Sequence, residues 1–167
     1  MDDPFESPPE AYTIRDFKME RMILSPVHWG SFVSPVPLDW EIILFSEDSV
    51  NAVPNNTRGV YSFVLQPGIA NHPHCSYLLY VGKAKDQVFR ARYRQYLQEK
   101  EKGIDSRRVH ISRMLQKWDG YLWFCYASVD NQDHINEIED ALLAAYLPSH
   151  NRMFPSQVRY ALKSALE

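Results

Sequence analysis

A short apolar run that ends at a glycine and is followed by cations is the first feature of this sequence that could do chemistry. Residues 78–81 have the composition of a strand, and Gly82 ends the run. Two lysines and three arginines then follow, namely Lys83, Lys85, Arg90, Arg92 and Arg94. Because glycine has no Cβ, the backbone at Gly82 could approach a ligand closely. The pattern predicts a site that handles a phosphate.

The distribution of charge supports this prediction, although the net charge of −3 does not. Between Lys83 and Lys117 there are eleven lysines and arginines against four aspartates and glutamates, a local charge of +7. The rest of the chain holds seven basic against seventeen acidic residues. Local charge sets the field over a surface, so the basic segment is a candidate site for a polyanion. A solvated helix face would give the same composition.

Three predicted strands and several helices have to position these residues. Strands are expected at 58–65, 77–82 and 121–129, and helices at 87–102, 106–118, from Asn131 or Asp133 to Tyr146, and at 156–166. The first two strands most simply pair as an antiparallel hairpin. The order β-β-α-α-β-α predicts a small α+β domain, in which helices flank a central antiparallel three-stranded sheet.

Both ends of the chain extend beyond this predicted domain. Residues 1–56 form an acidic extension that either packs on the domain or docks a partner, residues 57–154 form the domain, and residues 155–167 form a C-terminal helix. Within the extension, residues 12–24 could be a helix, and residues 40–45 could be either a strand or one helical turn.

The compartment expected from the sequence is a reducing cytoplasm. The longest apolar run, residues 141–147, is far shorter than the ~20 residues that cross a bilayer. The N-terminus is acidic, unlike that of a secretory signal. Cys75 and Cys125 are too few for a disulfide framework.

Two short strand motifs make the chain similar to a known family. Gly59-Val60-Tyr61 and Tyr80-Val81-Gly82 resemble the motifs for which the GIY-YIG endonucleases are named, a family that includes phage homing endonucleases and the nuclease domain of the bacterial excision-repair enzyme. An arginine on the next helix, a glutamate on a later helix and a final asparagine follow in the family's order. The resemblance covers Arg58 to about Phe154, and the first 56 residues match no known pattern.

The resemblance implies a role for each of these residues. Tyr61 would activate or position the attacking water, and Tyr80 would support it with a hydrogen bond. A tyrosine has an ordinary pKa near ~10, so it would need a nearby cation or metal-bound water to act as a base. Asn151 would hold the local geometry or hydrogen-bond near the phosphate. Two tyrosines that simply fill a core are the alternative.

The catalytic arginine is either Arg92 or Arg90. Arg90 follows Gly82 by eight residues, the spacing of several family members. Arg92 follows it by ten and has Tyr96 four residues further on, so both would share one helix face and could address the same phosphate. We favour Arg92, which would bind the scissile phosphate through two hydrogen bonds. The remaining basic residues would contact flanking phosphates or solvate the helix; they are Lys83, Lys85, Arg90, Arg94, Arg107 and Arg108.

Glu139 is the candidate metal ligand implied by the resemblance. One carboxylate together with water and phosphate oxygens suits Mg²⁺ or Mn²⁺, which would stabilise the leaving oxygen as a Lewis acid. A zinc site at His72, His74 and Cys75 is disfavoured, because the sequence supplies no clear fourth ligand.

These features together predict a metal-dependent endonuclease that cuts or nicks DNA in processing, restriction, repair or defence. RNA remains an alternative substrate. Sequence specificity would come from a protein partner, from a second copy of the chain or from the N-terminal extension, or cleavage would be weakly specific. The alternative function is a catalytically weak or inactive nucleic-acid-binding or scaffold subunit.

Overall fold

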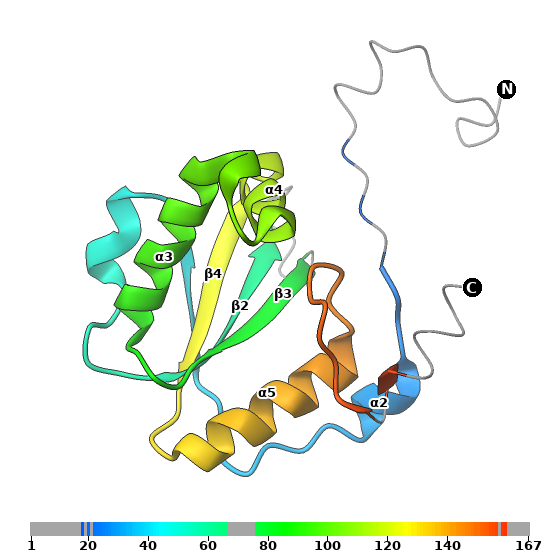
Figure 1. Ribbon diagram of the computed structural model, residues 1–167. Helices are drawn as coiled ribbons and strands as arrows, with labels where there is room; N and C mark the ends of the chain where they lie inside the picture. The colour runs from blue at the N-terminus through cyan, green and yellow to red at the C-terminus, as the bar shows by residue number, and fades with distance from the viewer. Residues whose placement is uncertain (1–17, 19, 21, 67–75, 157, 160–167) are drawn as a thin grey trace, which may run out of the picture.

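The computed structural model describes residues 18, 20, 22–66, 76–156, 158 and 159, and it has an α+β fold built on a four-stranded antiparallel sheet (Figure 1). The strands are β1 (Trp40–Leu44), β2 (Gly59–Leu65), β3 (Tyr77–Ala84) and β4 (Leu122–Ser128), and their order across the sheet is β1-β4-β2-β3. The α+β class is therefore confirmed.

The predicted three-stranded sheet is wrong in the number of strands. The segment that the sequence left as a strand or a helical turn is β1, which pairs with β4 from Trp40 opposite Ala127 to Leu44 opposite Trp123. Five residues are too few for their own periodicity to separate the two structures, so the long-range partner decides. The strand that completes the sheet thus comes from the segment predicted as an extension.

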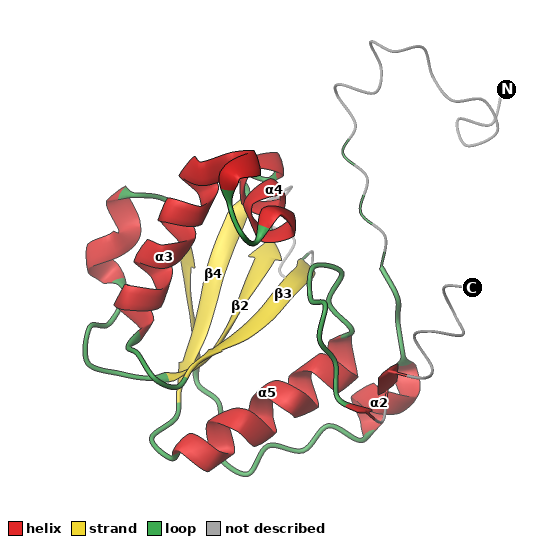
Figure 2. Cartoon of the chain, in the orientation of Figure 1, coloured by secondary structure: helices red, strands yellow, loops and turns green. Residues whose placement is uncertain are grey.

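Helices cover both faces of the sheet (Figure 2). On one face lie α3 (Phe89–Lys102), the short 3₁₀ helix η3 (Gly103–Asp105) and α4 (Val109–Lys117). On the other face lie α5 (Gln132–Tyr146) and the short α2 (Pro26–Gly30). A second 3₁₀ helix, η1 (Asp48–Ala52), precedes β2.

Local signals explain where the main helices begin and end. The predicted C-terminal glycine of α3 is Gly103, which has a φ of 55°. Asn131 is the N-cap of α5, and its side-chain oxygen accepts a hydrogen bond from the backbone N–H of Asp133 at 2.8 Å. At the other end of α5, Leu147 adopts the left-handed conformation and Pro148 follows.

The two ends of the chain are described only in part. Residues 18, 20 and 22–24, which belong to the expected helix 12–24, are not helical, and the rest of that helix lies outside the described residues. Most of the predicted helix 156–166 and the cluster of His72, His74 and Cys75 also lie outside them.

Two apolar cores hold the layers together. Every residue of β2 is buried, as expected for an inner strand with helices on both faces. Tyr61, Phe63 and Leu65 point into the core under α3 and α4. Val60, the residue before Tyr61, points into the core under α5, where Ile135 and Ile138 pack. The alternation follows from the two-residue period of a strand.

The edge strand β3 carries a β-bulge beside the predicted motif. Phe63 faces Tyr80 across the sheet and Val64 faces Leu78, so Leu79 is the extra residue. The bulge turns both Leu79 and Tyr80 toward the core under α3 and α4. Tyr80 therefore shares a face with Tyr61, and their ring centres are 6.5 Å apart.

The outer edge of β3 is covered by the segment that follows α5. The side-chain oxygen of Asn151 accepts from the backbone N–H of Val81 at 2.9 Å, and its amide nitrogen donates to the carbonyl of Val81 at 2.8 Å. The backbone N–H of His150 donates to the carbonyl of Leu79 at 3.0 Å. Asn151 thus takes the place of a neighbouring strand and satisfies backbone groups that an edge leaves open.

Gly82 is needed for packing inside the protein. It faces Tyr61 across the β2–β3 pair, and a Cβ at Gly82 would lie 2.5 Å from the Tyr61 hydroxyl oxygen and 2.6 Å from the ring carbon that carries it. The sequence suggested that Gly82 makes room for a ligand. In the structure, the space above Gly82 is filled by the ring of Tyr61.

We therefore predict that Gly82→Ala destabilises the protein by about 1–3 kcal/mol, the usual cost of overpacking a filled core. Gly30→Ala is the matched control, because nothing lies within 4 Å of a Cβ at Gly30. Urea denaturation of both variants measures the difference. Equal free energies of unfolding for Gly82→Ala and the wild type would contradict this prediction, because the Tyr61 ring would then not need the space over Gly82.

Candidate functional site

Arg92 and two tyrosines form a hydrogen-bonded group on the α3 side of β3. Nε of Arg92 donates to the hydroxyl of Tyr61 at 2.8 Å, and that hydroxyl lies 2.8 Å from the hydroxyl of Tyr96. The guanidinium also lies over the Tyr96 ring, 5.5 Å from its centre. Tyr61 and Tyr96 are fully buried. The spacing of four residues between Arg92 and Tyr96 thus brings both to Tyr61.

Gln95, which no sequence pattern pointed to, also holds the guanidinium, and Gln87 holds Gln95 in turn. Nη1 of Arg92 donates to Oε1 of Gln95 at 3.1 Å. Gln95 in turn exchanges two hydrogen bonds with Gln87, at 3.1 and 2.7 Å. Arg92 and Gln95 are three residues apart on α3, a spacing that could have revealed the contact. Gln87 precedes the helix and gave no such signal.

The tyrosine hydroxyls ionise less readily in this environment than an exposed tyrosine does. Burial raises the pKa of Tyr61 and that of Tyr96 well above the ordinary value, and the nearby Arg92 charge offsets only part of this effect. Burial, together with Tyr96, also raises the pKa of Tyr80. All three tyrosines therefore stay protonated over the ordinary pH range.

Arg90, the alternative catalytic arginine, does not contact the tyrosines and instead donates hydrogen bonds to backbone carbonyls. Its Nε donates to the carbonyl of Val53 at 2.7 Å, and Nη2 donates to the carbonyl of Asn51 at 2.9 Å. These bonds tie α3 to the end of η1 and the residue after it. Between the two arginines, only Arg92 reaches the tyrosines.

Glu139 on α5 is paired with the lysine that follows Gly82. Oε2 of Glu139 lies 2.5 Å from Nζ of Lys83, and the carboxylate is only 15% exposed. Burial raises the pKa of Glu139, although the charge of Lys83 and, more weakly, that of Arg92 lower it. At acidic pH, the fraction of Glu139 that is charged is therefore smaller than that of an exposed glutamate.

The two halves of the site belong to opposite faces of β3. Gly82 lies opposite Tyr61, on the Arg92 side, whereas Lys83 lies opposite Val60, on the α5 side. The charge of Arg92 contributes only weakly to the pKa of Glu139, less than that of Lys83. Asn151 contributes by fixing the strand between them.

The other predicted phosphate ligands differ in their contacts and exposure. Arg108 lies with its guanidinium carbon 5.2 Å from the centre of the Tyr96 ring, and it is 3.7 Å from the carboxylate of Glu99. Arg94 and Arg107 are exposed, and Lys85 is half-buried. Arg108 is therefore the member of this set that lies beside the tyrosine group.

A divalent cation would find one carboxylate at this site. Among the described residues, no group of three or more histidine, cysteine, aspartate or glutamate side chains could hold a metal ion. A single half-buried carboxylate is compatible with Mg²⁺, which keeps waters and takes substrate phosphate oxygens as ligands. Lys83 would have to leave Oε2 of Glu139 for an ion to bind there.

Comparison with known proteins does not assign a function to this geometry. No family model, no curated protein and no solved structure matches the chain. Within the described residues, no helix is long and apolar enough to cross a membrane.

The raised pKa of Glu139 can be tested by the pH dependence of protein stability. A carboxyl whose pKa is raised by folding stabilises the protein fully below its unfolded pKa, and this contribution is lost as the pH rises through the folded pKa. We predict that the free energy of unfolding of Glu139→Gln, taken relative to that of the wild type, increases from about pH 4 to about pH 7. The lower of these values lies near the ordinary pKa of glutamate. Urea denaturation at both pH values measures this difference. A difference that does not change with pH would contradict the burial effect.

Proposed function

We propose that the chain is a metal-dependent endonuclease of the GIY-YIG type that hydrolyses DNA phosphodiester bonds. One observation carries the proposal. An arginine is hydrogen-bonded to the first-motif tyrosine on one face of β3, and a carboxylate is paired with the residue after the second-motif glycine on the other face. Tertiary packing forms both contacts, because the residues in each pair lie far apart in the sequence.

Arg92 is the group that would bind the scissile phosphate. Its Nε and Nη1 are held by Tyr61 and Gln95, whereas Nη2 makes no hydrogen bond within the described part of the chain. A guanidinium held in this way is preorganised, because its orientation is set before the substrate arrives. It would stabilise the charge that builds up on the phosphate in the transition state.

The tyrosines would position groups and not remove protons. Their raised pKa values argue against a tyrosinate base at neutral pH. Tyr61 and Tyr96 would therefore act by orienting Arg92. Tyr80, which is less buried than these two, is the tyrosine better placed to hydrogen-bond the water or the phosphate.

Glu139 would hold the divalent ion. A bound Mg²⁺ or Mn²⁺ supplies Lewis-acid stabilisation of the leaving oxygen. Lys83, once released from Glu139 by the ion, could turn to a neighbouring phosphate. Sequence specificity would then depend on a partner protein or a second copy, in a cytoplasmic setting.

A second candidate function is a nucleic-acid-binding or scaffold subunit that does not cleave. The 2.5 Å pairing of Lys83 with Glu139 favours it, since the carboxylate that would bind the metal already has a cationic partner. Such a subunit would keep the basic segment for binding and would lose the metal.

Nicking of supercoiled plasmid with Mg²⁺ tests the proposal. We expect nicking by the wild type and a fall of about 100-fold or more for Arg92→Ala, the usual cost of removing one preorganised donor. A similar fall is expected for Glu139→Ala, because the ion loses its carboxylate. Lys102→Ala is the control, an exposed cation at the end of the same helix to which no phosphate contact is assigned, and it should nick normally. Cleavage that survives both substitutions would refute the mechanism, and binding without cleavage by the wild type would favour the scaffold subunit.

Arg90→Ala should behave in the opposite way to Arg92→Ala. It removes two charge-assisted hydrogen bonds to the carbonyls of Val53 and Asn51, so we expect a loss of stability of about 1.5–3 kcal/mol. Nicking per folded molecule should change little. Thermal denaturation and nicking by the same preparation measure both effects. A specific loss of nicking at unchanged stability would assign the catalytic role to Arg90 instead.

A further inference from the structure

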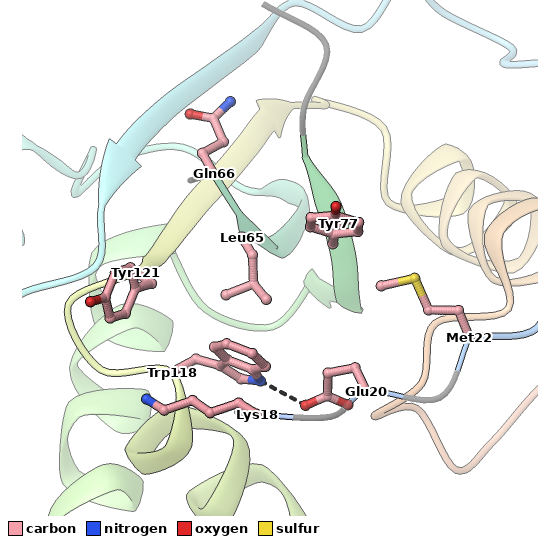
Figure 3. A pocket seen from close by; sticks show the side chains of 8 residues that line it. All are labelled: Lys18, Glu20, Met22, Leu65, Gln66, Tyr77, Trp118 and Tyr121. Atoms are coloured by element: carbon pink, nitrogen blue, oxygen red, sulfur yellow. Dashed lines mark hydrogen bonds between the residues drawn. The ribbon is translucent and has the colours of Figure 1, made fainter. Parts of the chain in front are cut away.

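A pocket of about 650 Å³ lies at the opposite end of β3 from Gly82 (Figure 3). It is formed where the ends of β2 and β3 meet the turn between α4 and β4, and the N-terminal segment closes one side. Its lining residues are Lys18, Glu20, Met22, Leu65, Gln66, Tyr77, Trp118 and Tyr121. None of them takes part in the site described above.

Aromatic rings from three different places in the chain line this pocket. Tyr77 starts β3 and is 45% exposed, and Tyr121 precedes β4 and is 57% exposed. Trp118 follows α4 and is half-buried. In Figure 3 the three rings surround the side chain of Leu65. The exposed rings of Tyr77 and Tyr121 beside an apolar floor are suited to stack a flat ring such as a nucleobase.

A charged acceptor lies on one side of the same pocket. Oε1 of Glu20 accepts from Nζ of Lys117 at 2.8 Å and from Nε1 of Trp118 at 2.6 Å, and Oε2 lies 3.2 Å from Nε2 of His150. Although burial opposes it, these partners lower the pKa of Glu20 overall, so the carboxylate stays charged. Since a carboxylate can accept about four hydrogen bonds, Oε2 can accept another one, for example from the amino group of a base.

A cation lies at the rim of the pocket. Nζ of Lys18 is 5.4 Å from the centre of the Trp118 ring and 5.6 Å from that of Tyr121, and it donates to the carbonyl of Lys117 at 2.5 Å. This position suits the phosphate that accompanies a bound base.

A basic face of α4 connects the pocket with the arginine–tyrosine site. His110, Arg113 and Lys117 share one face of the helix, since they are three and four residues apart. Arg108, just before α4, lies over the ring of Tyr96. From His110 to Trp118 the helix advances about 12 Å, the length of about three to four stacked nucleotides at ~3.4 Å each.

We propose that this pocket binds an unpaired nucleobase of a strand that runs along α4 from the Arg92 site. The inference rests on the proposed function for the identity of the ligand as nucleic acid, and it specifies the substrate further. The preferred substrate contains a single-stranded segment beside the bond that is cut, because a paired and stacked base could not enter the pocket.

Fluorescence anisotropy of labelled oligonucleotides tests this inference. A 15-residue single strand and its duplex are titrated in EDTA, so that binding is measured without cleavage. The double variant Tyr77→Ala/Tyr121→Ala should bind the single strand about 10-fold more weakly, within the range expected for the loss of base stacking. Duplex binding should change less than about 2-fold, because it depends on phosphate contacts.

Tyr146→Ala is the matched control, since Tyr146 is an exposed tyrosine at the end of α5, outside the pocket lining. It should bind both ligands as the wild type does. Circular dichroism of each variant checks that it is folded, and Tyr121→Ala alone replaces the double variant if that one unfolds.

The binding measurement separates this inference from the proposed catalytic function. A protein that does not nick plasmid but shows the selective loss of single-strand affinity supports the pocket and contradicts the nuclease. A protein that nicks plasmid but shows no such loss supports the nuclease and overturns the pocket. Equal weakening for single strand and duplex, or no binding of either by the wild type, also overturns it.

Discussion

The side chain of Tyr61 connects the inner strand β2 with the edge strand β3 and the helix α3. Its ring fills the space over Gly82, its oxygen accepts from Arg92, and it lies within hydrogen-bond distance of Tyr96. Three polar groups that would be costly to bury alone satisfy one another here. The geometry of Arg92 therefore depends on how β2, β3 and α3 pack, and any change in that packing should alter the direction of the guanidinium.

The edge of β3 imposes the second constraint. Its outer backbone groups are paired with the Asn151 side chain and the His150 backbone, and its bulge turns Tyr80 to the same face as Tyr61. The strand thus presents Gly82 on one face and Lys83 on the other. Under the proposed function, a phosphate at this edge would meet Arg92 from one side and Glu139 or Lys83 from the other. An edge strand suits such a site, because an inner strand has a neighbouring strand along each side.

Local sequence patterns predicted the parts of this architecture that depend on local chemistry. The three longer strands, the two helices after β3 and α5 follow from periodicity and capping, and the Arg92–Tyr96 spacing identified the arginine that meets the tyrosines. The fourth strand was left open between a strand and a helical turn, because β1 is short and its strand conformation depends on β4. The ion pair of Lys83 with Glu139 and the role of Gln87 were also missed, since both depend on tertiary proximity. Gly82 was singled out for the wrong reason, because the side chain that needs the space belongs to a different strand.

The central claim is that Arg92, oriented by Tyr61, binds a phosphate through its remaining N–H groups. It can be tested by ¹⁵N NMR of the arginine side chains during titration with a short oligonucleotide in Ca²⁺, with Arg92→Lys and Arg90→Lys used for assignment. The account predicts that the Nε–H signal of Arg92 is protected from exchange in the free protein and that its Nη signals shift on titration. The Arg90 signals should stay unchanged. An Arg92 side chain that exchanges freely, or one that does not respond to the oligonucleotide while Arg90 does, would contradict the account.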